Sequence, residues 1–182
     1  LIDEVIYTSS GGSTSTQISN VEDLISKGVD AIIITPNSPT GFKQVLEKAE
    51  EANIPVIMNA STVEEGNFTS FVSVDDREFG RKGAEWLVEK LDGSGKILAL
   101  SGKAGISVSE RRWSGAKEVF DEYEDVEVVT HEYASWSRPK AKQVVSSLLP
   151  AYPQIDGVWS GGGSMTAGAI QAFVSSGRDL VP

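Results

Sequence analysis

The sequence predicts an α/β protein with parallel β-sheets, and two observations lead to that fold class. Short apolar runs bounded by turn residues alternate with amphipathic stretches at intervals of about 25 to 30 residues, which is typical of repeated βα units. The run from Ala31 to Thr35 shows no polar alternation, as expected of a strand that helices cover on both faces. Such sheets bind ligands at the carboxyl ends of their strands, so the polar residues that follow each strand are the candidates for function.

The first part of the chain fits an alternation of strands and helices. A helix follows the polar loop 8–15 and is expected to end at Gly28, in a left-handed conformation. A second helix, with Phe42 and Leu46 on its apolar face, is expected to end near Asn53, because Pro55 prevents its continuation. The predicted strands in this part are 5–7, 31–35 and 56–59.

Residues 60–74 interrupt the alternation. They end in a predicted strand at 71–74 but contain no convincing helix, although two parallel strands normally need a crossover of about a dozen residues or more, usually helical. We therefore expect a change of lobe near Asp75, with residues 1–75 in one lobe and residues 76–182 in the other.

The alternation resumes in the second part. Asp76 can cap a helix that ends at Gly93, and Ser137 can cap a later helix in which Pro139 is tolerated in the first turn. The predicted strands are 96–100, 126–133 and 156–160, and further helices are predicted at about 108–122, 137–149 and 165–176. The helix that Asp76 would cap is expected to bear Phe79, Gly83, Trp86 and Leu87 on its inward face, and Trp113 and Trp159 are also expected in the core.

Composition excludes several classes of function. The chain has 182 residues and a formal net charge of −10, which disfavours binding to nucleic acids or anionic membranes. It has no cysteine and a single histidine, His131, so neither a Cys-based metal site nor a His-rich centre is expected, and no cofactor is predicted. No run reaches the roughly 18 to 20 apolar residues of a membrane span, and no signal segment opens the chain. The abrupt ends at Leu1 and Pro182 suggest a fragment of a longer chain.

Two glycine-rich turns do not match the catalytic motifs that they resemble. Gly93-Ser94-Gly95-Lys96 follows a helix and precedes a strand, which is the reverse of the order in a phosphate-binding loop. Residues 161–164, Gly-Gly-Gly-Ser, follow a strand and precede a helix, but Thr166 stands where a dinucleotide fingerprint or a nucleophile elbow needs its last glycine. Gly162 and Gly163 can still let a ligand approach the backbone, or they can form a plain tight turn. The sequence therefore predicts no enzyme.

Arg112 and Trp136 are the strongest candidates for ligand binding. Arg111 and Arg112 lie early in a predicted helix, where cations oppose the helix dipole, and that conflict indicates a use such as bidentate hydrogen bonding. The alternative is a solvated pair near Glu110. Trp136 lies on a loop between a strand and a helix, where it could stack on the apolar face of a sugar ring or simply pack at the strand end.

Polar residues at two other places complete the list of candidates. Asn59 and Ser61 close a predicted strand and could exchange hydrogen bonds with hydroxyl groups. Asp75 and Asp76 stand at the expected lobe boundary, where Asp76 would cap the helix and Asp75 would be a cleft or hinge residue, unless both are caps.

Five stretches, in family order along nearly the whole chain, carry a resemblance to a known family. They are residues 17–36, which include Gly28-Val29-Asp30-Ala31, residues 52–57, Val74-Asp75 with Gly80, Ser101 to Gly105 leading to Arg112-Trp113-Ser114-Gly115, and residues 152–159. The chain resembles periplasmic sugar-binding proteins of the ribose-binding type, which share their fold with the effector domains of LacI-type repressors.

The resemblance implies two Rossmann-like lobes with parallel sheets, joined by a hinge, that close on a ligand, the type 1 periplasmic binding protein fold. It implies a partial chain, in which residues 1–75 lack the first strand and helix of the N-terminal lobe and residues 76–182 lack the final strands of the C-terminal lobe. By the same resemblance, Arg112 is the ligand-binding arginine, Trp136 the ring-stacking aromatic, and Asp75 the first hinge crossing. The family often has Asp-Arg where this chain has Ala60-Ser61, and Asn-Asp where it has Gly162-Gly163, which argues against ribose itself as the ligand.

The implied function is that of a solute-binding component of an ABC importer for a sugar or polyol. Its partners would be that small molecule and a membrane permease, with no nucleic acid for this segment, and its location periplasmic or extracellular, free or as a lipoprotein. The alternative is the ligand-sensing effector domain of a LacI-type regulator. A DNA-binding helix pair upstream of Leu1 would indicate the regulator, and a signal peptide there would indicate the transporter. Without the family's first strand, which lies inside its sheet, strand edges are exposed, so self-association of this chain is predicted.

Overall fold

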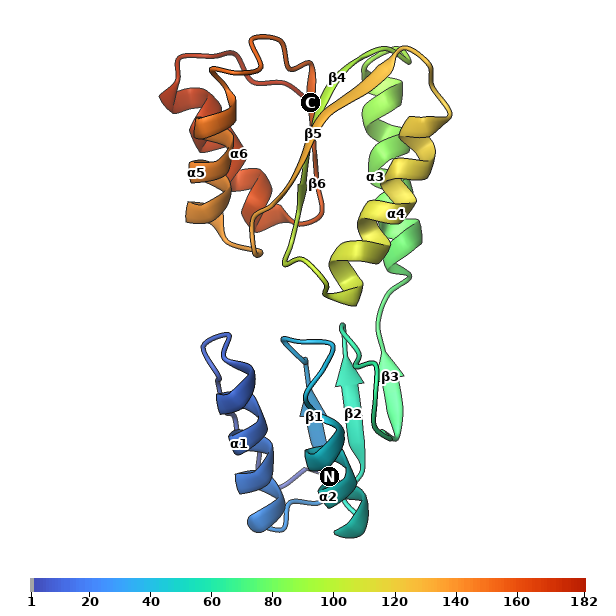
Figure 1. Ribbon diagram of the computed structural model, residues 1–182, viewed down its shortest axis with the longest axis vertical. Coiled ribbons are helices and arrows are strands. Elements are labelled where there is room, and N and C mark those ends of the chain that lie inside the picture. Colours follow the sequence, from blue (N-terminus) through green and yellow to red (C-terminus); the bar gives the residue numbers. More distant parts are fainter. Residues whose placement is uncertain (1) are drawn as a thin grey trace. The chain divides into compact units, whose positions relative to one another are not determined.

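The computed structural model describes residues 2–182, which divide into two compact units, one up to Val74 and one from Asp75 to Pro182 (Figure 1). Asp75, which the sequence analysis placed at the end of the first lobe, belongs by its contacts to the second unit. Each unit has its own parallel sheet and its own core, so each is described by itself.

The first unit has a three-stranded parallel sheet in the order β1-β2-β3. Ile33 is opposite Ile57, and Asn59 is opposite Val72. The core lies on one face of this sheet, where Ile34 and Met58 pack with Leu46 of the second helix. The elements are α1 (Thr14–Ser26), β1 (Ile32–Ile34), α2 (Lys43–Glu51), β2 (Val56–Asn59) and β3 (Ser70–Val72).

The ends of both helices follow from local chemistry. The Ser13 hydroxyl accepts a hydrogen bond from the Thr16 backbone N–H and caps α1, and Gly28 just beyond it has a φ of +69°. Asn53, after α2, has a φ of +56°, a left-handed conformation that asparagine tolerates better than most residues. The predicted stops at Gly28 and Asn53 are therefore confirmed.

The predicted strand at Val5–Tyr7 is wrong. Residues 2–10 form no strand, and a groove of about 330 Å³, lined by residues 6–10 and 32–35 among others, separates this segment from the edge of β1. A strand exists only where its backbone groups join a ladder, and here Val5 and Tyr7 remain exposed instead. The apolar composition of the segment was not enough to predict its structure.

The second unit has a three-stranded parallel sheet in the order β5-β4-β6, with helices on both faces (Figure 1). Alternate residues of the central strand β4 point to opposite faces, so Leu98 and Leu100 pack with the core under α5 and α6. Ile97 and Ala99 pack with the core under α3 and α4. The elements are α3 (Asp76–Lys90), β4 (Gly95–Ser101), α4 (Ser107–Asp121), β5 (Val126–Tyr133), α5 (Arg138–Leu148), β6 (Gly157–Ser160) and α6 (Gly163–Ser175).

Helices α3 and α4 cross in direct backbone contact. A Cβ atom on Gly80 would overlap the carbonyl group of Arg112, and one on Gly115 would overlap the carbonyl group of Arg77. The two glycines thus allow the helices to approach more closely than any other residue would. This close crossing places the beginning of α3 beside the middle of α4, around Arg112 and Gly115.

Two predictions for α3 are wrong. Its N-cap is Asp75, whose carboxylate accepts hydrogen bonds from the N–H groups of Arg77 and Glu78, whereas Asp76 is the first helical residue. The cap must have an extended conformation, and Asp75, with φ −71° and ψ 95°, has it. The predicted inward face is also wrong: Phe79 and Trp86 are 48% and 52% exposed, because the buried face of α3 is displaced by about one residue from the predicted one. That face comprises Asp76, Gly80, Ala84, Leu87 and Val88.

The predictions for Trp113 and Trp159 hold. Trp159 of β6 is buried, and Trp113 is partly buried against the core under α3 and α4. The Ser137 hydroxyl caps α5 by accepting a hydrogen bond from the Lys140 N–H, with Pro139 in the first turn as predicted. Because β4, β5 and β6 are parallel, the polar and glycine-rich loops that follow them lie at the same edge of the sheet.

Candidate functional site

The candidate site of the second unit lies at the carboxyl edge of its sheet. It combines Arg112 of α4, which follows β4, with Trp136 of the β5–α5 loop and Gly161 and Gly162 of the β6–α6 loop. This is the edge at which parallel sheets bind ligands, because loops from several strands converge there.

Arg112 is held by groups from three parts of the chain. Its Nε donates to Asp76 Oδ1 at 2.8 Å, and its Nη1 donates to the Gly161 carbonyl oxygen at 2.8 Å. The guanidinium carbon lies 4.2 Å from the centre of the Phe79 ring, a cation–π distance, and 5.7 Å from that of Trp136. Two of its five N–H groups are therefore used, and the side chain is still 19% exposed.

Trp136 is fixed by an unusual backbone and by two glycines. Ser135 and Trp136 have φ values of +52° and +56°, a conformation that is uncommon for residues other than glycine. A Cβ on Gly102 would overlap the indole ring, and one on Gly162 would lie 3.0 Å from it. The ring therefore rests on the backbone of two neighbouring loops, half-buried, in a defined orientation beside Arg112.

Next to these residues, the ends of β4 and β5 carry a compact hydrogen-bonded group. His131 Nε2 lies 2.7 Å from Ser101 Oγ, and the Tyr133 hydroxyl donates to the Glu110 carboxylate at 3.1 Å. Burial is the largest cause that lowers the pKa of His131 below 6.5, against the opposing charges of Glu110 and Glu132. Burial also raises the pKa of Tyr133 above 10, assisted by its hydrogen bond to Glu110.

The carboxyl edge of the first unit carries a separate polar network. Gln17 Nε2 donates to the Thr35 carbonyl at 2.9 Å, and its Oε1 accepts from the Asn37 N–H at 3.0 Å. Asn59 Nδ2 donates to Thr35 Oγ1 at 3.2 Å, while Asn59 itself is exposed. Ser61, by contrast, is only 5% exposed, so its side chain has little surface for a ligand.

The structure thus brings together only part of the predicted site. Arg112, Trp136 and Gly162 meet at one edge of the second unit. Gly163 begins α6, with open space where a side chain would lie, and Asp75 caps α3. Asn59 and Ser61 belong to the first unit.

Sequence analysis missed three residues of these edges. Asp76 was considered only as a cap and Phe79 only as a core residue, whereas both contact the Arg112 guanidinium. Asn37, which follows β1, was not singled out, although its position after a strand was a signal that could have identified it. For the contacts of Asp76 and Phe79 the sequence contains no comparable signal, because they depend on the crossing of α3 and α4.

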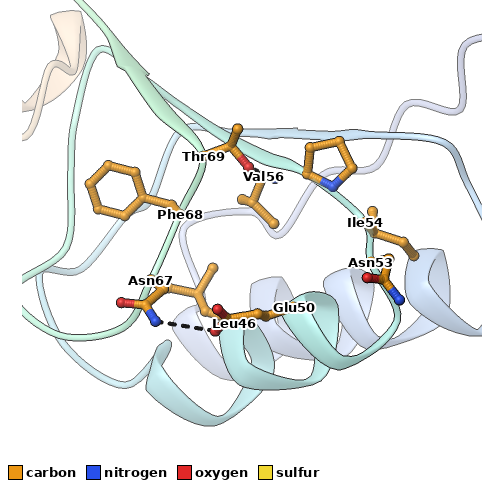
Figure 2. Close-up of a pocket in the computed structure, with 9 residues that line it drawn as sticks. Leu46, Glu50, Asn53, Ile54, Val56, Asn67, Phe68 and Thr69 are labelled. Atoms are coloured by element: carbon orange, nitrogen blue, oxygen red, sulfur yellow. Dashed lines mark hydrogen bonds between the residues drawn. The ribbon is translucent and has the colours of Figure 1, made fainter.

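A pocket of about 360 Å³ lies at the opposite end of the first sheet (Figure 2). Asn67 from the β2–β3 connection donates to Glu50 of α2 at 3.2 Å across it, and Val56, the first residue of β2, also lines it. It therefore lies at the amino end of the strands, away from the edge that carries Asn59. Among residues 2–182 no group of His, Cys, Asp or Glu side chains is placed to hold a metal ion. None of the helices described above is long and apolar enough to cross a bilayer.

Comparison with known proteins identifies relatives along nearly the whole chain. A family model for the periplasmic binding protein domain matches residues 1–181. The chain is 32% identical over 178 residues to the ribose import binding protein of Bacillus subtilis, covering 98% of this chain and 58% of that one. It is also 32% identical over 180 residues to a xylitol-binding protein of Mycolicibacterium smegmatis, covering 98% and 52% of the two chains.

A solved structure has the same fold. The binding protein component of the arabinose ABC transporter of Shewanella sp. ANA-3, bound to L-arabinofuranose, is 33% identical, with a TM-score of 0.87 over 91% of this chain and 57% of that one. The chain thus spans little more than half the length of these relatives. The predicted α/β class with parallel sheets is confirmed. The match of the family model and the relatives of the ribose-binding type together show that this chain belongs to the periplasmic binding protein family.

Proposed function

We propose that this chain is the ligand-binding part of a solute-binding component of an ABC importer, and that it binds an uncharged sugar or polyol. The observation that carries the proposal is the pairing of Arg112 and Trp136 at the carboxyl edge of the second sheet, with 5.7 Å between the guanidinium carbon and the ring centre. The names of the relatives, which include ribose-binding and xylitol-binding proteins, support the same class of ligand.

Each residue has a chemical role in the proposal. The N–H groups of Arg112 that Asp76 and Gly161 do not use would donate to ligand hydroxyls, and the Trp136 ring would cover an apolar sugar face. Gly162 and Gly163 would let the ligand approach the backbone. Asn59 would contribute amide hydrogen bonds from the first unit. Ser61, being buried, would act through the shape of its loop rather than through its hydroxyl.

The proposal contains no covalent step. The pair that most resembles a nucleophile with its base is Ser101 and His131, 2.7 Å apart. Ser101 is buried, so its hydroxyl has no path to a substrate, and the pair is better explained as a hydrogen bond within the core of the unit. Binding alone therefore accounts for the site.

The remaining parts of the proposal concern transport, location and self-association. Closure of the two lobes on the sugar, near Asp75, would present the liganded protein to a membrane permease, and the location would be periplasmic or extracellular, free or as a lipoprotein. We also propose that this chain self-associates, because β1 is an edge strand in the described sheet and Ile33 on its uncovered face is 74% exposed.

A ligand panel tests the proposal. Thermal unfolding of the protein expressed from its complete coding sequence should shift upward with at least one sugar or polyol in a panel of pentoses, hexoses and alditols, because a ligand that binds only the folded state stabilises it. Isothermal titration of that ligand should then show a loss of affinity of about tenfold or more in Arg112→Ala and in Trp136→Ala.

Two matched variants serve as controls. Arg111→Ala removes the neighbouring exposed arginine, and Trp86→Ala removes an exposed tryptophan of α3, so both should retain wild-type affinity. If no sugar or polyol stabilises the protein, or if the controls lose affinity as much as the site variants do, the proposal is wrong.

A further inference from the structure

The Asp76–Arg112 ion pair is the least exposed of the ion pairs in the described residues. The Asp76 side chain is 1% exposed, and its Oδ1 atom lies 2.8 Å from Arg112 Nε. The Lys117–Asp121 pair on α4, by contrast, is more than half exposed at both partners. An exposed pair contributes little, whereas a buried carboxylate is costly unless a cation is fixed against it.

The backbone fixes this pair from both sides. Asp76 is the first residue of α3, where the helix dipole favours a negative charge, and Gly80 lies one turn further along. Arg112 lies in the second turn of α4, and its own carbonyl packs against Gly80. The crossing therefore brings a carboxylate that its own helix stabilises to a cation on the other helix.

The pair also leaves a defined part of the guanidinium for a ligand. Asp76 binds Nε, and the Gly161 carbonyl binds Nη1, while Phe79 and Trp136 lie within cation–π range. Arg112 can thus still donate hydrogen bonds at the sheet edge, but its positive charge is balanced a few ångströms away by a carboxylate that solvent does not screen.

We infer that Asp76 is a positioning and specificity-determining residue, which orients Arg112 and neutralises it so that the edge binds uncharged polyhydroxy compounds in preference to their carboxylate or sulfate counterparts. This inference rests on the proposed function and adds to it the means by which anions are rejected. An arginine alone is a good anion site, and a fixed countercharge removes that affinity without removing the donors.

The test compares ligands that differ by one carboxylate. Affinities of xylitol and xylonate, and of D-galactose and D-galacturonate, are measured by calorimetry on the protein from its complete coding sequence. The wild type should prefer the uncharged member of the pair that it binds. Asp76→Asn keeps an acceptor for Nε but removes the charge, so the ratio of the two affinities should shift toward the anion by about tenfold or more.

Two further variants separate charge from shape. Asp121→Asn removes the same charge from the exposed Lys117–Asp121 pair on α4 and should leave the ratio unchanged. Asp76→Glu keeps the charge with a longer side chain and should keep the preference for the uncharged member. The inference is wrong, while the proposed function stands, if Asp76→Asn binds both members with the wild-type ratio of affinities or if the wild type prefers the anion. If the wild type binds no uncharged member at all, the proposed function itself is wrong.

A second measurement uses no Asp76 variant and compares the wild type with Arg112→Ala. Sodium sulfate, titrated at constant ionic strength against sodium chloride, should give no site-specific stabilisation of the wild type relative to Arg112→Ala. A sulfate-dependent rise in the melting temperature that Arg112→Ala lacks would mean that Arg112 is an uncompensated anion site, and this would overturn the inference.

Discussion

His131, the only histidine in the chain, is held between an aromatic ring and a buried hydroxyl. Its ring stacks on Trp113 with centres 4.0 Å apart and an angle of 17° between planes, and Nε2 lies 2.7 Å from Ser101 Oγ. Burial lowers its pKa below 6.5, although the charges of Glu110 and Glu132 act in the opposite direction. The native state therefore favours the neutral imidazole.

This position predicts how stability depends on pH. Because the folded-state pKa is lower than the unfolded-state value of about 6.5, the unfolded chain binds the proton more readily as the pH falls below that value. The free energy of unfolding should therefore be largest above pH 6.5 and should decrease toward pH 5.5, until the folded-state pKa is reached. Urea unfolding at pH 7.5, 6.5 and 5.5 measures it.

His131→Gln provides the reference for this measurement. Glutamine can keep a hydrogen bond to Ser101 but does not titrate, so the variant should show a smaller decrease between pH 7.5 and 5.5 than the wild type does. Because the two proteins differ only at this residue, the difference between their pH dependences measures the contribution of His131. Equal slopes for the two proteins, or a wild type that gains stability on acidification, would contradict the assignment.

At the scale of residues, the sequence predicted functional candidates better than their partners. Arg112 was singled out because a cation early in a helix opposes the helix dipole, but the structure places it in the second turn of α4, where that effect is small. Its partner is Asp76, 36 residues away. No local pattern specifies such a pair, because it depends on how two helices cross. The cap of α3 is Asp75 rather than Asp76 for a related reason: which of two adjacent carboxylates caps a helix depends on where the extended backbone ends.

At the scale of elements, the α3–α4 crossing is the feature on which the site depends. Gly80 contacts the carbonyl of Arg112, and Gly115 contacts the carbonyl of Arg77, so each helix packs a glycine against the backbone of the other. A methyl group at either position would push the helices apart, and since Arg112 is on one helix and Asp76 on the other, it would also disturb their ion pair.

We predict that Gly80→Ala and Gly115→Ala each reduce the free energy of unfolding by about 1 to 3 kcal/mol, as overpacked sites do, despite the better helix propensity of alanine. Gly163→Ala is the matched control, because a Cβ there meets nothing within 4 Å and the residue lies in the first turn of α6. That variant should be neutral or slightly stabilising in the same urea titration. Unfolding free energies that do not distinguish Gly80→Ala from Gly163→Ala would show that the crossing tolerates separation.

The limits of sequence-based prediction for elements follow from packing. Helix ends at Gly28, Asn53 and Gly93 were predicted because glycine and asparagine adopt the left-handed conformation that such ends require, and all three have positive φ values. The buried face of α3 was misplaced by about one residue, because it is set by the contact with α4 rather than by the positions of its largest apolar side chains. Thus Trp86, which fits an apolar pattern, lies outside the core.

At the scale of the whole chain, the two sheets differ in how they are covered. The sheet of the second unit has a packed core on each face, whereas the described core of the first unit lies on one face of its sheet. Ile33 on the other face of β1 is exposed, and the β1 edge borders the groove next to residues 6–10. Taken by itself, the apolar run 31–35 indicates a strand covered on both faces. The exposed strand edge was predicted only from the family resemblance.

An uncovered edge strand is a site of pairing between copies, because its free backbone groups and apolar side chains can extend the ladder of another chain. The 182-residue chain should therefore sediment in part as a dimer or larger species, increasingly with concentration. Ile33→Lys places a charge on this strand and should shift the distribution toward the monomer without reducing the free energy of unfolding, since Ile33 is exposed. Ile170→Lys makes the same exchange at an exposed position of α6 and should leave the distribution as in the wild type. Sedimentation velocity over a tenfold range of concentration distinguishes these outcomes, and a wild-type chain that remains monomeric throughout would refute pairing through β1.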